Sequence, residues 1–186
     1  MLGVVHCKCG QKYADQSGLT TVELCEAAKG MKHPSGVTTS YKDGASRDAA
    51  KNDAEAAMVG RMRAHLKNSP AFRTRLAVAE RKVSASLKDS SDGASYPPGA
   101  CAAQKVLVLL LDDRAVPAAM TERWYGSETG SPIAYLEVSG TGRKRTRNRV
   151  VRKFKNGETV PPCGTCELLV PLLTCAQERP TCKHRT

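Results

Sequence analysis

The chain has 186 residues and a formal net charge of +11, from 29 Lys and Arg against 18 Asp and Glu. This length suits one domain with a sizeable core, and because only 4% of the residues are aromatic, Leu, Val, Ala and Met must fill it. The longest apolar run, Val106–Leu111, is too short to span a bilayer, and the N-terminus lacks the basic and apolar regions of a secretory leader. We therefore expect a monomer without a membrane partner, in a compartment that the sequence does not specify.

The first half of the chain predicts a loop-rich segment followed by two helices. Residues 1–43 mix short extended runs with Gly, Ser and Pro, and they predict a loop-rich N-terminal extension. Residues 46–66 are rich in helix formers, with apolar residues at every fourth position from Ala54 and with Ser46 as the expected N-cap. Pro70 predicts the start of a second helix, whose end near Leu87 also fits the alternation of a strand.

The second half predicts a buried helix, two strands and a final helix. A polar loop over 88–99 leads to a helix at 100–111 that is apolar on all sides and holds Cys101 in its first turn. The later segments are expected to form a short helix at 117–124, strands at 133–138 and 149–154, a turn at Asn156-Gly157, and a helix from Cys163 that Pro171 kinks or ends.

Two cysteine motifs carry the strongest chemical signal. Cys101 opens the run Cys-Ala-Ala-Gln, whereas Cys163 and Cys166 belong to the run Pro-Cys-Gly-Thr-Cys. Thiolates at this spacing can converge on one tetrahedral ion, so the pattern favours zinc over a disulfide for these three residues.

The other five cysteines are Cys7, Cys9, Cys25, Cys175 and Cys182. Cys7 and Cys9, together with Cys25 and His33, offer the ligands of a second, structural zinc site. Because this spacing matches no common zinc module, a disulfide or simple burial is the favoured interpretation. Cys175 lies in an apolar stretch and is expected in the core.

The two motifs resemble the metal-binding halves of the zinc-dependent cytidine deaminase-like superfamily, in particular its divergent nucleic-acid deaminases of bacterial toxins and fungi. There a His or Cys, one spacer and a Glu open one helix, and Pro-Cys-x-x-Cys opens the next. The resemblance covers Tyr96 to Cys175. It implies an α/β fold with a central sheet flanked by helices and a helical N-terminal extension. The deaminase-like domain would span 44–186, including a helical lead-in at 46–88, and its sheet is small, permuted or completed by the N-terminal region.

The resemblance also implies a chemistry, and one residue departs from it. Zinc on Cys101, Cys163 and Cys166 would activate a water, and a Glu two residues after the first ligand would carry its proton to the base and help ammonia leave. That position is Ala103 here. Either Ala103 is an inactivating substitution, the interpretation that we favour, or the chain is natural and uses another carboxylate, with Glu122 and Glu167 as candidates.

A basic segment suggests the class of substrate. Eight of the thirteen residues from Arg143 to Lys155 are basic and none is acidic; they are Arg143, Lys144, Arg145, Arg147, Arg149, Arg152, Lys153 and Lys155. This segment predicts contact with the phosphates of a nucleic acid, DNA in preference to RNA, although a solvated loop or a localisation signal has the same composition. Trp124 and Tyr125 are candidates for stacking on a base, or else core or gate residues.

Three classes of function follow. The first is zinc-dependent deamination of cytosine to uracil in single- or double-stranded DNA, with this chain inactivated at Ala103. The second is a free nucleoside deaminase, which the basic segment disfavours. The third is a non-enzymatic nucleic-acid-binding domain that zinc stabilises, with Ala103 native.

Overall fold

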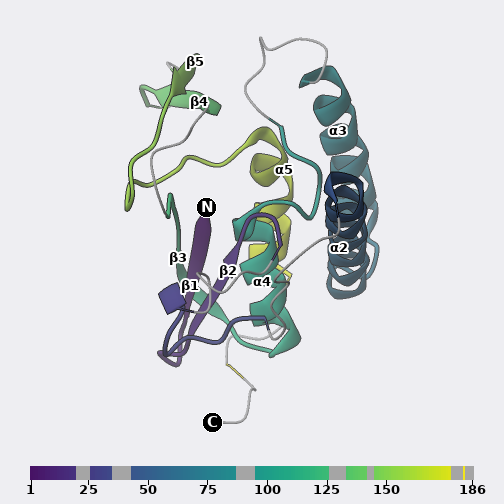
Figure 1. Cartoon of the computed structure of the whole chain (residues 1–186), viewed down its shortest axis with the longest axis vertical. Helices are drawn as coiled ribbons and strands as arrows, with labels where there is room; N and C mark the ends of the chain where they lie inside the picture. The colour runs from purple at the N-terminus through teal and green to yellow at the C-terminus, as the bar shows by residue number, and fades with distance from the viewer. Residues whose placement is uncertain are drawn as a thin grey trace.

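The structure is a computed structural model that describes residues 1–19, 26–34, 43–86, 95–125, 133–141, 145–176 and 182. It is a mixed α/β fold (Figure 1). Its elements are β1 (Leu2–Cys7), β2 (Lys12–Gln16), α2 (Gly44–His65), α3 (Pro70–Ser86), α4 (Ala102–Asp112), β3 (Pro117–Arg123), β4 (Ile133–Ser139), β5 (Thr146–Arg152) and α5 (Gly164–Thr174). Among the described residues, no helix is both long and apolar enough to cross a membrane.

The main sheet has three antiparallel strands in the order β2-β1-β3. Its central strand is β1, in which Leu2 pairs with Gln16 on one side and with Arg123 on the other. Residues 2–16, which were expected in a loop-rich segment over 1–43, thus supply two of the strands of this sheet. Strand β3 corrects the short helix predicted at 117–124. The hydrogen bonds that this segment makes with the free edge of β1 outweigh the helix propensity of its Ala, Met and Glu residues.

Helix α4 lies against the sheet and contacts all three strands, while α5 packs beside α4 (Figure 1). Helix α3 packs against α5, and α2 against α4. Apolar side chains of β1, β2 and the four helices share one core, whose largest fully buried members include Phe72, Met62, Leu107, Leu110 and Leu169. The even apolarity of the 100–111 segment thus reflects a helix enclosed by the sheet and its neighbouring helices.

Several details of the helices differ from the sequence prediction. The N-cap of α2 is Asp43, and the predicted N-cap Ser46 is wrong. Ser46 instead donates its backbone N–H to the Asp43 carboxylate at 2.7 Å. Pro70 begins α3 as predicted. Pro171 lies inside α5, which ends at Thr174 one turn later. Cys175 then follows as an exposed residue, so its predicted burial was wrong.

Strands β4 and β5 form a separate antiparallel hairpin in which Ile133 pairs with Arg152 and Ser139 with Thr146. The predicted strands are confirmed, although β5 begins three residues earlier than expected. The buried side chains of Tyr135, Phe154 and Val160 pack together at the base of the hairpin. They anchor the hairpin beside the end of β3, where the backbone of Trp124 bonds that of Glu158 and Gly157.

Candidate metal centre

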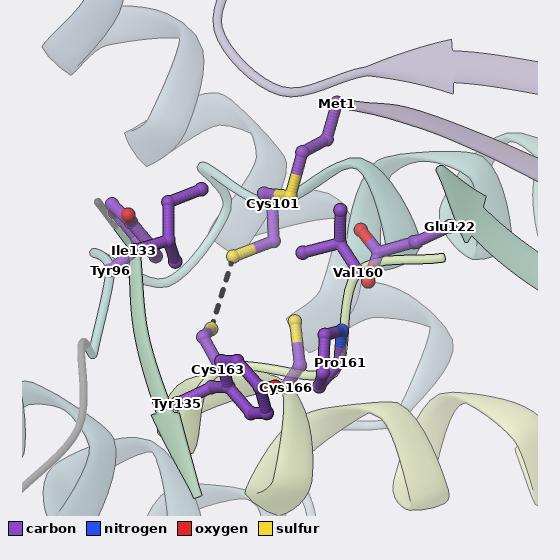
Figure 2. Close-up of a pocket in the computed structure, with 10 residues that line it drawn as sticks. All are labelled: Met1, Tyr96, Cys101, Glu122, Ile133, Tyr135, Val160, Pro161, Cys163 and Cys166. Carbon is purple, nitrogen blue, oxygen red and sulfur yellow. Dashed lines mark hydrogen bonds between the residues drawn. The ribbon is translucent and has the colours of Figure 1, made fainter. Parts of the chain in front are cut away.

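Three cysteines converge where the N-termini of α4 and α5 meet. Cys101 is the N-cap of α4, Cys163 is the N-cap of α5, and Cys166 lies in the first turn of α5. The Cys101 and Cys163 sulfurs are 3.3 Å apart, and all three sulfurs lie within 4.8 Å of one another (Figure 2). The predicted trio is thus brought together, and it could hold a metal ion.

A tight turn places Cys101. Gly99 has a φ of +89°, and a Cβ added there would lie 2.5 Å from the carbonyl oxygen of Glu55 on α2. Glycine alone meets both demands, because it tolerates positive φ and carries no side chain. Thr165 fixes the approach from α5, since its hydroxyl donates to the carbonyl of Tyr96 at 2.6 Å.

A buried glutamine links this turn to the sulfur cluster. Gln104 is fully buried, its Oε1 accepts the Gly99 N–H at 2.8 Å, and its Nε2 donates to the Cys166 sulfur at 3.4 Å. Both ends of the amide are therefore used, as a buried polar group requires. Sequence reasoning did not single out Gln104; a polar residue inside an apolar helix, three positions after a ligand, was the available signal.

The electrostatics of the trio favour one thiolate beside two neutral thiols. Hydrogen bonds from the Cys101 and Cys166 thiols lower the pKa of Cys163 to about 3, whereas the pKa of Cys101 is raised by its bonds to Cys163 and Cys166 and by burial. The pKa of Cys166 is also raised, because the lowering effect of Cys101 is outweighed by its bond to Cys163 and by its burial. One thiolate is therefore stabilised by two thiols at two positive helix ends. A soft divalent cation would allow all three to ionise, because thiolates are ligands that zinc prefers. The donor set fits zinc.

Ala103 lies beside this cluster and is paired with Glu122. The Ala103 side chain is 1% exposed, and its backbone N–H donates to Oε1 of Glu122 on β3 at 2.9 Å. Glu122 is 9% exposed and lines the same pocket as the three cysteines (Figure 2). Its carboxylate thus satisfies a free amide in the first turn of α4.

Burial gives Glu122 unusual acid–base behaviour. It raises the pKa of this carboxyl to about 7, against the opposing effect of the Ala103 N–H bond. A carboxyl that titrates near neutral pH can take up and release protons. Glu167, the other candidate, lies half-buried in the first turn of α5 and lines an adjoining groove together with Ala103, Glu122 and Cys166. Both candidates are therefore close to position 103, and only Glu122 bonds to it.

The pocket at the cysteines is small and partly apolar. Besides the three cysteines and Glu122, it is lined by Met1, Tyr96, Ile133, Tyr135, Val160 and Pro161. Ile133 and Tyr135 belong to β4, so the base of the β4–β5 hairpin forms one wall (Figure 2).

The basic segment is only partly described. Arg143 and Lys144 lie outside the described residues, whereas Arg147 and Arg149 lie on β5, whose side chains there are not described. Arg145, Arg152, Lys153 and Lys155 are exposed. The guanidinium of Arg152 lies 4.4 Å above the Phe154 ring and 3.8 Å from the Glu158 carboxylate. Part of its charge is therefore used in contacts within the protein.

The two candidates for base stacking, Trp124 and Tyr125, differ in their exposure to solvent. Trp124 is half-buried and packs in the cluster of Tyr135, Phe154 and Val160, in agreement with the core alternative. Tyr125 is 48% exposed and is available for contact with a ligand.

The alternative second zinc site of Cys7, Cys9, Cys25 and His33 is described only in part. Cys25 lies outside the described residues, and His33 uses its Nδ1 for a bond to the carbonyl of Pro34. Cys7 and Cys9 instead lie with Cys182, a partner that the sequence analysis left unassigned.

Comparison with protein-family models, with curated proteins and with solved structures returned no match.

Proposed function

We propose that this chain is a zinc-dependent hydrolytic deaminase that converts cytosine to uracil in DNA. The observation that carries the proposal is the convergence of three cysteine sulfurs at two helix N-termini beside the buried carboxylate of Glu122. Zinc with three protein ligands and an open position is the arrangement of catalytic sites. The side-by-side packing of α4 and α5, each beginning at a ligand, supports the same proposal.

Each residue has a defined task in this scheme. Cys101, Cys163 and Cys166 would hold zinc, and the bound ion would supply an activated water as nucleophile. Glu122 would accept a proton from the attacking water and deliver it to the ring N3. It would then take the second proton of that oxygen, as the C4 carbonyl forms, and pass it to the amino group, which leaves as ammonia. Gln104 would hold the Cys166 sulfur in place through its Nε2. Water and cytosine are consumed, and uracil and ammonia leave.

The placement of Glu122 favours a natural chain with a relocated carboxylate over an inactivating substitution at Ala103. A Glu at 103 would bring a second carboxylate beside the one that already bonds the Ala103 N–H, and two like charges in one buried site oppose each other. The small Ala103 side chain leaves room for the carboxylate that arrives from β3. Under this scheme the chain as written is active.

The β4–β5 hairpin, which carries much of the basic segment Arg143–Lys155, supports a polynucleotide substrate. Its base forms a wall of the cysteine pocket through Ile133 and Tyr135, and Arg152 pairs with Ile133 in the ladder. Cationic side chains that flank this end would bind phosphates while the reacting base is brought to the mouth of the pocket. Tyr125, exposed just after β3, would stack on a neighbouring base.

A panel of substrates tests the proposal. Zinc-loaded protein would be incubated with single-stranded DNA, double-stranded DNA, RNA and free cytidine, and uracil would be measured by mass spectrometry. We expect uracil from DNA and none from cytidine. The Cys163→Ser/Cys166→Ser variant should lose the zinc bound there and all activity; unchanged zinc in this variant would overturn the metal assignment.

The second candidate is a nucleic-acid-binding domain that zinc stabilises. The observation in its favour is Ala103, which can carry no proton. Under this alternative Glu122 only caps α4, and binding persists without any conversion of cytosine. Tight DNA binding with no uracil formed from any substrate would favour this alternative over the deaminase.

A further inference from the structure

A second group of three cysteines lies near the opposite end of α4 from Cys101. Cys7 is the last residue of β1, Cys9 lies in the following turn, and Cys182 comes from the C-terminal part of the chain. The Cys7 sulfur is 2.9 Å from that of Cys182 and 3.0 Å from that of Cys9, and all three lie within 4.8 Å of one another. Because α4 has 11 residues, its length of roughly 16 Å separates this group from the first trio.

The backbone around Cys7 and Cys9 forms a tight turn that directs both sulfurs to one point. The Cys7 N–H donates to the Gln11 carbonyl at 2.8 Å, and the Gly10 N–H donates back to the Cys7 carbonyl at 3.0 Å. Gly10 has a φ of +92°, which glycine adopts without strain. The pairing of β1 with β3 shifts between His6 and Cys7, so the strand is locally irregular where the sulfurs meet.

We propose that Cys7, Cys9 and Cys182 form a second metal site, which binds zinc and is structural. A disulfide bond joins only two sulfurs, at about 2.05 Å, and would leave the third unused. Three sulfurs that all face one another instead match a shared ion, around which thiolate ligands at about 2.3 Å stand roughly 3.8 Å apart. A small widening of the observed contacts reaches that geometry.

The surroundings of the site agree with a structural role. The turn that carries Cys7 and Cys9 is held by the backbone hydrogen bonds of Cys7 and Gly10. The Lys8 N–H also donates to the Val116 carbonyl, which ties the turn to the segment between α4 and β3. Cys182 packs against the main core, so a bound ion would fasten the chain after α5 to the end of β1.

Zinc stoichiometry of the purified, reduced full chain tests this site independently of the proposed deaminase. We expect two zinc ions per chain, one after Cys182→Ser, one after Cys163→Ser/Cys166→Ser, and none when these changes are combined. Exposed Cys175 provides the control, and Cys175→Ser should keep both ions. Cobalt replacement adds a second measurement, since the thiolate-to-cobalt charge-transfer absorption should fall by about half in Cys182→Ser.

Two results would overturn the second site. One is an unchanged zinc count in both Cys182→Ser and Cys9→Ser; the latter alters an exposed residue and spares the core. The other is a chain purified under reducing conditions whose mass and thiol count show a Cys7–Cys182 disulfide. The two sites can fail separately. Absence of zinc at Cys163 and Cys166 would contradict the proposed function and leave the site of Cys7, Cys9 and Cys182 intact.

Discussion

The backbone N–H of Ala103 donates a 2.9 Å hydrogen bond to the buried carboxylate of Glu122. Ala103 belongs to α4 and Glu122 to β3, so the contact brings an acid from the sheet to the helix that carries Cys101. In a deaminase-like motif the acid stands on the helix itself. The contact supplies the same functional group from a different element, which is the basis of the relocated carboxylate proposed above.

Gln104 should be required for a tight metal centre. Gln104→Leu keeps the side-chain size and removes both hydrogen bonds, which leaves the Gly99 N–H buried without an acceptor. We expect a loss of about 1–3 kcal/mol of unfolding free energy and a zinc affinity about 10–100-fold weaker. Urea unfolding and competition with a chromophoric chelator measure these effects. Gln11→Leu, which removes only a bond to the neighbouring Lys12 carbonyl, should change neither quantity.

Asp15 should make stability depend on pH. It is 5% exposed on β2, and burial raises its pKa from 3.8 to about 6, although Lys105 opposes the shift. The folded state therefore binds the proton more tightly than the unfolded state. The stability that this proton confers is complete below about pH 4 and is lost as the pH rises through 6.

Asp15→Asn removes this dependence, because the amide stays neutral. We expect the variant to be more stable than the parent by about 2–3 kcal/mol above pH 7, from a shift of about two pKa units, and equal to it below pH 4. Urea unfolding across this range checks the prediction. Asn at exposed Asp53 serves as the control. A gain that does not vary with pH would contradict the assigned titration.

The basic hairpin should contribute affinity for nucleic acid and leave the metal unaffected. Replacing exposed Arg145, Lys153 and Lys155 with Gln removes three cations. The slope of log affinity against log salt should become shallower by up to about 0.9 for each duplex phosphate that the variant no longer neutralises. Fluorescence anisotropy at several salt concentrations measures this slope. The triple Gln variant of Arg47, Arg63 and Lys67, which are exposed in α2 and the turn after it, should keep the parent slope.

Local sequence signals predicted helices α2 to α5 and the cysteine trio. Pro70 and the Pro-Cys-Gly-Thr-Cys run mark helix starts through backbone constraints that act within a few residues, and α3 and α5 begin there. Cys101, Cys163 and Cys166 were predicted from spacing and resemblance, and their sulfurs do converge.

Long-range contacts account for what the sequence did not reveal. The segment 117–124 has helix-forming residues, yet its pairing with β1 makes it a strand, and that choice also delivers Glu122 to Ala103. The partnership of Cys7 with Cys182 joins residues 175 positions apart, a separation that no local pattern encodes. Burial of Cys175 failed as a prediction because the residue follows the last turn of α5, where the apolar face ends.

An exchange of the acid between two positions tests the central claim most directly. Glu122→Gln keeps an oxygen that can accept the Ala103 N–H and removes the proton carrier, so zinc content should match the parent. Because burial raises the pKa of the Glu122 carboxyl to about 7, the neutral amide should leave the unfolding temperature unchanged at acidic pH and raise it at alkaline pH. Uracil formation from cytosine in DNA should fall by about two to four orders of magnitude in this variant. The double variant Ala103→Glu/Glu122→Gln, which returns the acid to α4, should recover part of the lost rate. Uracil production by the parent, its loss in Glu122→Gln and its return in the double variant are the predicted result; equal uracil production by the parent and a folded, zinc-loaded Glu122→Gln protein would contradict the account.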